Sequence, residues 1–468
     1  MERTFSAIAR ADVNIDRSNV VRKFEGYRHT VGHGGINSFP LPPKVKKALA
    51  GLRPKLVRAF IQEYFNVLPE KGVYDWSKLD PYMESLSVEG SSVVASICVK
   101  PKVLFPQIDE NVVMPNDINE WQKLVEAIVH RYSVEKNIVS HWEIANEPDI
   151  GENGGCPYKF NSPDEYNGYY KITAEAVLRA CPGVKVGGPA LAYAKSELME
   201  GLLSYCSSNN FRLDFISWHC YSDDPRAHAD NIRHMKRLAG KYYPGRPPEM
   251  MITEMSKGFD PVVCEETAFD AFRPATIAAC VFAMMDEFVD YSFYYHIWDQ
   301  VFIVGEFESF YKNPEIMAVH WNYTPHRFGL LGVMGEVRPA YFVYKALSEM
   351  SGSEVKVECA SEDILVKSTV DGGVSTTMAV NYNAVQSRDM MLTLRYENFA
   401  PGIYEMSVKR IGEDLRYNET ELDIIERRFI DVRGPVYFNV LSSAYSVAVV
   451  RMKPVSADTV KKTYENMK

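Results

Sequence analysis

The sequence contains no apolar run long enough to cross a membrane. No stretch approaches the roughly eighteen consecutive apolar residues that a spanning helix needs. The first twenty residues also lack the apolar segment of a signal peptide. We therefore expect no membrane partner and a cytoplasmic protein, or a secreted or periplasmic one if a leader has been removed from this chain.

Paired cysteines and positive charge are scarce as well. The eight cysteines stand singly, with no CxxC pair and no Cys/His cluster at the spacing of metal ligands. This pattern argues against a disulfide framework and against a metal or other cofactor. Lysine and arginine number 52 against 61 aspartates and glutamates, which gives a formal net charge of −9. Because nucleic-acid binding relies on a basic surface, we expect no nucleic-acid partner. The oligomeric state is left open, and a homo-oligomer is compatible with the sequence.

What the sequence does contain is an alternation of short β-rich apolar runs with amphipathic helical stretches. The eight runs occupy residues 31–35, 56–62, 92–100, 140–148, 184–190, 214–221, 249–255 and 291–298. Eight strands alternating with helices are typical of a (β/α)₈ TIM barrel. The rival fold is a doubly wound open sheet, but no GxGxxG motif follows any of the runs. We predict an α/β fold with a catalytic barrel over residues 25–350.

The pattern changes after about residue 350, where the helical spacing stops. Short strands such as VSTTMAVNY and PVYFNVL follow, separated by turn signals such as DGG and APG. This pattern predicts an accessory antiparallel β-sandwich over residues 351–468. The alternating segment FSAIARADVNI lies too early to be a barrel strand, and we expect residues 1–24 to add a strand to the sandwich.

Two carboxylates lie at the ends of two predicted barrel strands. The fourth strand ends in NEP, which contains Glu147, and the seventh ends in TEM, which contains Glu254. TIM-barrel chemistry takes place at the carboxyl ends of the strands, so the two glutamates face each other across the barrel mouth. Glycoside hydrolysis needs such a pair of carboxyl groups. We expect a separation of about 5–5.5 Å, as in retaining enzymes, and not the roughly 6.5–9.5 Å of inverting ones.

The order of several sequence blocks resembles family 39 of the glycoside hydrolases, which belongs to clan A and includes β-xylosidases and α-L-iduronidases. The blocks are EIANEP, VGGPA, DFISWHCY, ITEM and YYHIWDQVF, followed by PHRFGLLGVMGEVRPAYFVYKAL. The resemblance covers about residues 25–350. It implies a retaining exo-glycosidase that acts on oligosaccharides or polysaccharides, with Glu147 as the general acid/base and Glu254 as the nucleophile.

Several neighbours of these glutamates match further positions of the family. Asn146 matches the asparagine that binds the 2-hydroxyl of the sugar in the clan. Arg58 matches a strand-two arginine that helps to order the nucleophile, and a purely structural role is the alternative. His219 and Tyr221 match the Ser-x-His-x-Tyr block, and strand alternation turns both to one face, where either could keep the nucleophile ionised. Trp298 matches the strand-eight tryptophan, on which the apolar face of a sugar would stack.

Three more polar residues are candidates for the barrel interior or its rim. Glu143 lies four residues before Glu147 on the same strand, about 13 Å deeper, and we expect it to form a buried ion pair with Arg58. His33 and Lys102 lie beyond strands one and three. We expect these two either to touch the substrate or to lie in solvated loops.

The match departs from the family's β-xylosidases in ways that concern the substrate. Ala145 stands where they usually have tryptophan, Phe60 where they have histidine, and Asp149 where an asparagine often follows NEP. The sequence therefore leaves the sugar open among xylose, arabinose and galactose. A catalytically inactive carbohydrate-binding barrel and a metal-dependent hydrolase are the alternative functions. The presence of both glutamates argues against the first, and the lack of a His/Asp ligand cluster argues against the second.

Overall fold

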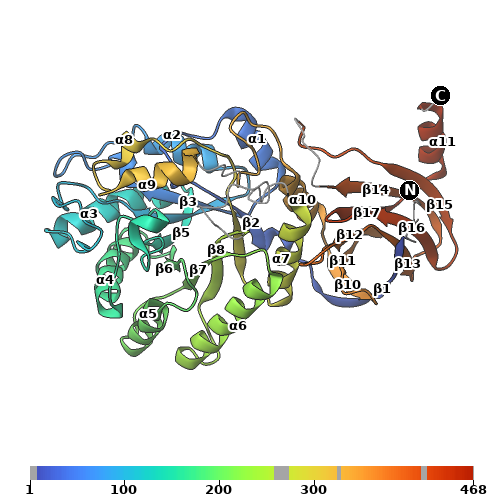
Figure 1. The fold of residues 1–468 in the computed structure, drawn as a ribbon, viewed down its shortest axis with the longest axis horizontal. Helices are drawn as coiled ribbons and strands as arrows, with labels where there is room; N and C mark the ends of the chain where they lie inside the picture. Colours follow the sequence, from blue (N-terminus) through green and yellow to red (C-terminus); the bar gives the residue numbers. More distant parts are fainter. Residues whose placement is uncertain (1–7, 258–272, 324–327, 413–418, 467–468) are drawn as a thin grey trace, which may run out of the picture. The chain divides into compact units, whose positions relative to one another are not determined.

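The computed structural model describes residues 8–257, 273–323, 328–412 and 419–466. One of its two sheets is a closed barrel of parallel strands that follow one another in chain order from β2 to β9 (Figure 1). The predicted TIM barrel is confirmed. Its strands are β2 (His29–His33), β3 (Leu56–Gln62), β4 (Ser92–Cys98), β5 (Val139–Ile144), β6 (Lys185–Leu191), β7 (Phe215–Tyr221), β8 (Glu249–Ser256) and β9 (Tyr291–Tyr295).

The barrel strands are apolar because both of their faces are covered. Every residue of β2 and β3 is buried, as expected for parallel strands with helices on one side and the barrel interior on the other. Inside the barrel, five apolar side chains near the beginnings of their strands pack together: Leu56, Val94, Phe215, Met251 and Phe293. This layer fills the amino-terminal end of the barrel, so the functional end is the one where the strands finish.

Helices occupy the intervals between most barrel strands. They are α1 (Pro43–Gly51), α2 (Leu79–Leu86), α3 (Ile118–Val129), α4 (Pro163–Ala180), α5 (Glu197–Ser208), α6 (Pro225–Tyr242) and α7 (Pro274–Asp286). The side chains of Asp117, Ser162 and Asp224 accept backbone N–H groups at the beginnings of α3, α4 and α6, which satisfies donors that have no partner within the helix. In the part of the chain that is described, none of the helices has the length and apolarity needed to cross a membrane.

Four barrel strands end earlier than the sequence predicts, and the largest differences are at β5 and β9. β5 ends at Ile144, because Ala145 adopts a left-handed conformation with φ +71°, which no extended strand can continue. β9 ends at Tyr295, and the next two residues pair with a later segment: the N–H groups of Leu330 and Leu331 donate to the carbonyls at positions 296 and 297. Beyond β9 come the short helices α8 (Val304–Phe307) and α9 (Pro314–Ala318) and a π-helical turn at Val319–Tyr323.

The second β region is confirmed as a mostly antiparallel sheet. Its nine strands form one continuous sheet in the order β15-β14-β17-β12-β11-β10-β1-β13-β16, and the β1–β13 pair is parallel. The strands are β1 (Ala9–Lys23), β10 (Ser353–Cys359), β11 (Ile364–Asp371), β12 (Val374–Asn381), β13 (Met390–Glu397), β14 (Gly402–Ile411), β15 (Glu426–Val432), β16 (Val436–Ser442) and β17 (Val447–Pro454). The amino-terminal strand β1 lies between β10 and β13. Buried side chains from both ends of the strand order join one apolar core, so the sheet folds around itself.

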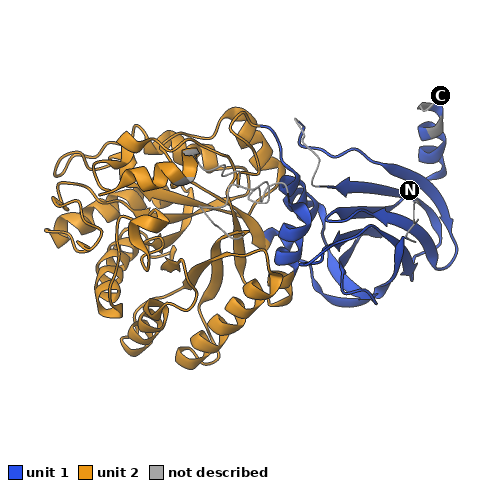
Figure 2. Ribbon diagram, viewed as in Figure 1, with its two compact units in different colours: residues 1–27, 270–282, 336–468 blue, residues 28–269, 283–335 orange. Residues whose placement is uncertain are grey.

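The chain divides into two compact units (Figure 2). One unit contains residues 28–269 and 283–335, which include the barrel strands. The other contains residues 1–27, 270–282 and 336–468, which include the nine-stranded sheet, α10 (Pro339–Glu349) and α11 (Ala457–Asn466). In this division the barrel unit ends at residue 335, and α10 groups with the sheet that follows it.

Candidate active site

Glu147 lies on a tight turn just beyond the end of β5. Ala145 and Glu147 both adopt left-handed conformations, with φ +71° and +43°. Such conformations are unfavourable for residues with a side chain and persist only where the surroundings hold them. Here the Ser96 hydroxyl donates to the carbonyl of Ala145 at 2.8 Å, and the Glu147 N–H donates to the carbonyl of Ala190 at 2.8 Å. The turn thereby directs the Glu147 side chain into the barrel mouth.

Glu254, on β8, and His219, on β7, lie opposite this turn. His219 Nδ1 is 2.7 Å from Glu147 Oε1 and 3.5 Å from Glu254 Oε2. One carboxylate oxygen of each glutamate and a ring nitrogen of His219 all lie within 4.8 Å of one another. All three residues are buried. The two glutamates singled out from the sequence are therefore close enough to act on a single bond.

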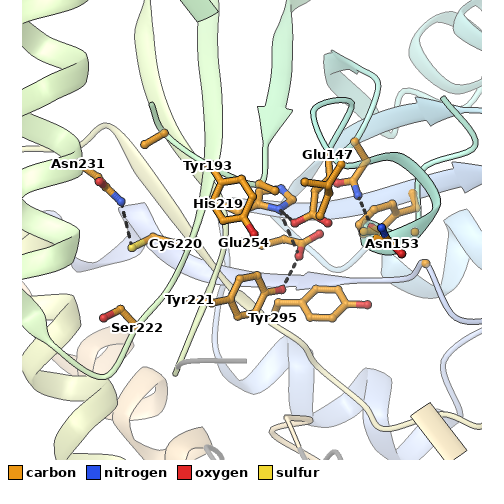
Figure 3. Close-up of a pocket in the computed structure, with 18 of the residues that line it drawn as sticks. Glu147, Asn153, Tyr193, His219, Cys220, Tyr221, Ser222, Asn231, Glu254 and Tyr295 are labelled. Atoms are coloured by element: carbon orange, nitrogen blue, oxygen red, sulfur yellow. Dashed lines mark hydrogen bonds and ion pairs between the residues drawn. The ribbon is translucent and has the colours of Figure 1, made fainter. Parts of the chain in front are cut away.

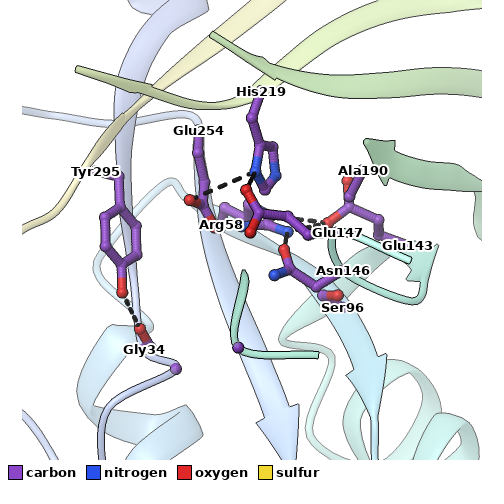
Figure 4. A network of polar contacts seen from close by, with 12 residues as sticks. Gly34, Arg58, Ser96, Glu143, Asn146, Glu147, Ala190, His219, Glu254 and Tyr295 are labelled. Atoms are coloured by element: carbon purple, nitrogen blue, oxygen red, sulfur yellow. Dashed lines mark hydrogen bonds and ion pairs between the residues drawn. The ribbon is translucent and has the colours of Figure 1, made fainter. Parts of the chain in front are cut away.

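Arg58 lies beneath the two glutamates and joins three acceptors (Figure 4). Its guanidinium is 2.6 Å from Glu254 Oε1 and 2.7 Å from Glu143 Oε2, and it donates to Asn146 Oδ1 at 2.6 Å. Arg58 and Glu143 are completely buried, so the predicted ion pair between them is confirmed. The pair anchors a cation directly under Glu254.

The electrostatics of the site distinguish the two glutamates. Burial raises the pKa of Glu147 well above its ordinary value, and the nearby charge of Glu254 raises it further. Burial raises the pKa of Glu254 too, but the Arg58 guanidinium and a hydrogen bond from the Tyr221 hydroxyl act in the opposite direction. Burial and Arg58 together hold the pKa of His219 well below its ordinary value, so its ring is neutral. The pKa of Glu147 is therefore raised more strongly than that of Glu254, so the proton of the pair is held on Glu147.

These side chains line a cavity of about 630 Å³ at the carboxyl ends of the strands (Figure 3). The volume is within the range of small-molecule sites, about 300–1,000 Å³. Asn146, Glu147, His219, Tyr221 and Glu254 all contribute to its wall. Four aromatic residues that pack together line one side of the cavity: the buried Phe60 and Tyr295 and the half-buried Tyr221 and Trp321.

A comparison with protein families agrees with this geometry. The sequence profile of the family described as "Glycosyl hydrolases family 39" matches residues 59–416, which is more than half of the chain. The chain belongs to this family. The resemblance inferred from the sequence blocks is thereby confirmed.

Individual relatives of this family 39 chain were found among curated proteins and solved structures. It is 33% identical over 116 residues to a β-xylosidase of Geobacillus stearothermophilus, a match that covers 24% of this chain and 22% of that protein. It is 24% identical over 267 residues to a β-xylosidase of Caldicellulosiruptor saccharolyticus, covering 53% and 50% of the two chains. The chain thus matches half or less of the length of these curated relatives. The crystal structure of a monomeric β-xylosidase from Caulobacter crescentus is similar over 96% of this chain and 100% of its own, with a TM-score of 0.75 and 19% identity, which shows the shared fold.

Arg58 lies beneath the cavity, and three further residues expected at the site also lie outside the cavity lining. His33 is buried, and its ring stacks on those of Tyr82 and His296. Lys102 is exposed on the loop after β4. Trp298 lies past the end of β9, where its indole N–H donates to the carbonyl of Val333 at 3.2 Å. Because the chain turns away after Tyr295 to pair with residues 330 and 331, Trp298 anchors this loop and does not contribute to the cavity wall.

Other cavity residues were not identified as site residues from the sequence. Trp321 follows the short helix α9, and Tyr193 and Lys195 follow β6. Tyr193 and Lys195 lie in a loop and Trp321 lies in a single π-helical turn, and segments of this kind have no periodicity that indicates which side chains face inward. Phe60 and Tyr295 are on strands, and alternation does place them on the inner face. The apolar character of Tyr295 is typical of an ordinary core residue, and Phe60 stands out in the sequence only as a departure from the family's β-xylosidases.

Glu147, His219 and Glu254 also form a cluster that could offer three ligand atoms to a metal ion. Both carboxylate oxygens of Glu254 already accept hydrogen bonds, one from Arg58 and one from Tyr221. A cation bound here would also lie close to the Arg58 guanidinium, and like charges at such a distance repel. The three residues are therefore better suited to act as a general acid/base and a nucleophile than as ligands of a metal ion.

Gly154 leaves no room for a side chain beside Glu147, which leads to a testable prediction. A Cβ added at position 154 would overlap Glu147 Oε2, although the backbone there is not left-handed. We therefore expect Gly154→Ala to displace the carboxyl group of Glu147. For substrates with poor leaving groups, kcat/KM should fall by about 10- to 100-fold, because general acid catalysis contributes up to about 10⁴-fold. Activated phenyl leaving groups should suffer less.

Gly183→Ala is the matched control for this experiment, because a Cβ at position 183 meets nothing within 4 Å. The measurement is kcat/KM of the two variants for an alkyl glycoside and a dinitrophenyl glycoside of the same sugar. Equal losses for both kinds of leaving group in Gly154→Ala would mean that the glycine serves the fold and not the position of Glu147.

Proposed function

We propose that this family 39 chain is a retaining exo-glycosidase that removes terminal sugars from oligosaccharides or polysaccharides. Glu254 attacks the anomeric carbon while Glu147 protonates the departing oxygen, and Glu147 then removes a proton from the water that releases the sugar. The observation that carries this proposal is the approach of the two carboxylates, which have oxygens within 4.8 Å of each other. Inverting enzymes need room for a water between their carboxyl groups, which are about 6.5–9.5 Å apart.

The surroundings of each glutamate support its role. A general acid must be protonated at the start of the reaction, and the raised pKa of Glu147 meets this requirement. A nucleophile must be charged, and Arg58 and Tyr221 both stabilise the carboxylate of Glu254. His219 contacts Glu147 Oε1 at 2.7 Å and orients it. Asn146 accepts from Arg58 and donates one amide hydrogen to the carbonyl of Gly154, so its other amide hydrogen can reach the 2-hydroxyl of a sugar.

The shape of the cavity supports removal of terminal sugars. Phe60 and Tyr295 are buried, their rings meet edge to face with centroids 6.3 Å apart, and the ring of Trp321 packs edge-on against Tyr295. The Tyr295 hydroxyl donates to the carbonyl of Gly34 at 2.7 Å, which holds this wall in place. A long chain that ran through the site would need an opening on this side. A terminal sugar fits against this aromatic wall, with the rest of the substrate on the other side.

A panel of nitrophenyl glycosides tests this proposal and identifies the sugar. The curated relatives are named β-xylosidases, so β-xyloside is the first member, followed by α- and β-arabinosides, galactosides and uronides. We expect release of nitrophenol from at least one member, with retained configuration in the first-formed sugar by NMR. Binding of sugars without turnover of any member would favour the alternative, an inactive carbohydrate-binding barrel.

Removal of divalent metals should leave the reaction unchanged. The Arg58 guanidinium supplies positive charge next to Glu254, so the proposed mechanism needs no cation there. We expect full turnover of the best nitrophenyl glycoside after dialysis against a chelator. Loss of activity that a single divalent ion restores would contradict the proposed use of Glu147, His219 and Glu254.

The pH dependence should reflect the two glutamates. Because the pKa of Glu147 is raised, its acid form persists toward neutral pH, and kcat/KM should fall as rising pH removes that proton. On the acid side, kcat/KM should fall as Glu254 becomes protonated. With a nitrophenyl substrate, whose leaving group is a weaker one than dinitrophenolate and gains from a proton, Glu147→Gln should lose the alkaline limb and keep the acid one. An alkaline limb that persists in this variant would assign the titrating acid to another residue.

A further inference from the structure

The residues that line the cavity differ in their exposure to solvent. Around Phe60 and Tyr295 the lining is buried, whereas the segments that follow Glu147 and β6 bring three exposed residues to the rim: Asn153, Tyr193 and Lys195. An acid/base catalyst protonates the oxygen that joins the terminal sugar to the leaving group. The leaving group therefore lies on the Glu147 side, against this exposed rim.

On the basis of the proposed function, we propose that Tyr193 is a stacking platform for the leaving group and selects substrates whose leaving group contains a ring. The side chain of Tyr193 is 66% exposed. Among the large apolar side chains that are exposed in the described residues, it is the one that lines the cavity (Figure 3). An exposed aromatic ring in the wall of a cavity offers its apolar face to whatever binds there. A sugar ring or an aryl ring presents the flat apolar face that would cover it.

The backbone beneath Tyr193 is held in place by a side chain next to the acid/base. Asp149 lies two residues after Glu147, and its Oδ1 and Oδ2 accept the N–H groups of Ala192 at 2.9 Å and of Tyr193 at 3.1 Å. The carbonyl of Tyr193 in turn accepts the N–H of Ser196 at 3.0 Å. Two hydrogen bonds to Asp149 thus form a clamp that positions the Tyr193 platform relative to Glu147. A subsite for the leaving group needs such a fixed position, because the leaving group must lie within reach of the acid/base.

The clamp explains why position 149 carries an aspartate. Both of its oxygens act as acceptors, and a carboxylate has two acceptor atoms. An asparagine would turn one NH₂ group toward a backbone N–H, so that two donors would face each other. Asp149→Asn should therefore loosen the Tyr193 loop while leaving the Tyr193 ring present.

Binding of thioglycosides tests the platform separately from catalysis, because the sulfur-linked bond is cut very slowly. The probes are the methyl 1-thioglycoside, the phenyl 1-thioglycoside and the sulfur-linked disaccharide of the sugar that the nitrophenyl panel selects. The variants are Tyr193→Ala, Tyr193→Phe as the matched control that keeps the ring, and Asp149→Asn. Dissociation constants come from calorimetry, and thermal unfolding checks that each variant is folded.

We expect the wild type to bind the two ring-bearing probes about fivefold more tightly than the methyl probe, the scale of one aromatic contact. Tyr193→Ala should reduce this preference below about twofold, Tyr193→Phe should keep it, and Asp149→Asn should weaken it. A loss for the phenyl probe alone would restrict the platform to aryl groups, and a loss for the disaccharide alone would restrict it to sugars.

Two results would overturn the platform: an undiminished preference in Tyr193→Ala, or equal weakening of all three probes, which would place the ring against the terminal sugar. Equal binding of all probes by the wild type would overturn it as well. Failure of the proposed function is distinguishable from these results, because it would appear as no turnover of any panel member by the wild type.

Discussion

Glu254→Ala is expected to abolish turnover of every glycoside, by on the order of 10⁴-fold or more, because no covalent intermediate can form without the nucleophile. Activated leaving groups should not rescue this variant. Added azide can replace the missing carboxylate by direct displacement at the anomeric carbon. The product of that reaction is the glycosyl azide of inverted configuration.

Glu147→Ala should behave differently, because Glu147 acts first as an acid and then as a base. A dinitrophenyl leaving group needs no proton, so the intermediate still forms and dinitrophenol appears in a burst. Hydrolysis of the intermediate then stalls, since no base activates water. Azide needs no base and should restore turnover, giving a glycosyl azide that retains the configuration of the substrate.

Product configuration by NMR and burst kinetics are the measurements for both glutamate variants. Glu175→Ala, which removes an exposed carboxylate paired with Lys171 on α4, is the control for handling and folding. If the two variants gave azides of the opposite configurations, the roles of Glu147 and Glu254 would have to be exchanged. If neither substitution changed turnover, the reaction would take place elsewhere in the molecule.

Arg58→Met is expected to destabilise the barrel by about 3–5 kcal/mol, the usual effect of removing one partner from a buried ion pair. The substitution leaves Glu143 and Glu254 buried without their shared cation and removes the donor to Asn146. It also removes an interaction that lowers the pKa of Glu254. The acid limb of the kcat/KM profile should therefore move to higher pH, and turnover at neutral pH should fall.

The matched control is Arg179→Met, which breaks an exposed ion pair between α4 and Glu126 of α3. Such pairs contribute about 0–1 kcal/mol, so its unfolding midpoint in urea should change little. In Arg58→Met the pKa of Glu254 in the folded state is higher still than in the unfolded chain. Its contribution to stability is therefore present at acid pH and is lost as the pH rises through that pKa. The deficit relative to the wild type should widen from acid to neutral pH, and a deficit independent of pH would point to lost packing instead.

The positions of the barrel strands and of the two glutamates could be predicted from local sequence alone. Strands that are buried on both faces must be short apolar runs. Only a few architectures are compatible with an alternation of such runs and helical stretches. Glu147 and Glu254 stand out because polar residues that end such runs emerge at one rim. The Arg58–Glu143 pair could be predicted for the same reason: both residues are charged within apolar strands and share the barrel interior.

What surrounds the glutamates was decided by tertiary structure. Trp298 stands at the end of an apolar run, yet residues 296 and 297 pair with positions 330 and 331 and carry Trp298 away from the cavity. Trp321 lines the cavity wall instead. Tyr193 reaches the rim because Asp149, far from it in sequence, binds its backbone. Periodicity reports which face of a strand or helix is apolar, and it carries no information about loops. Loop conformations depend on single contacts between distant segments, and in this protein those contacts determine what lies around the bond to be cut.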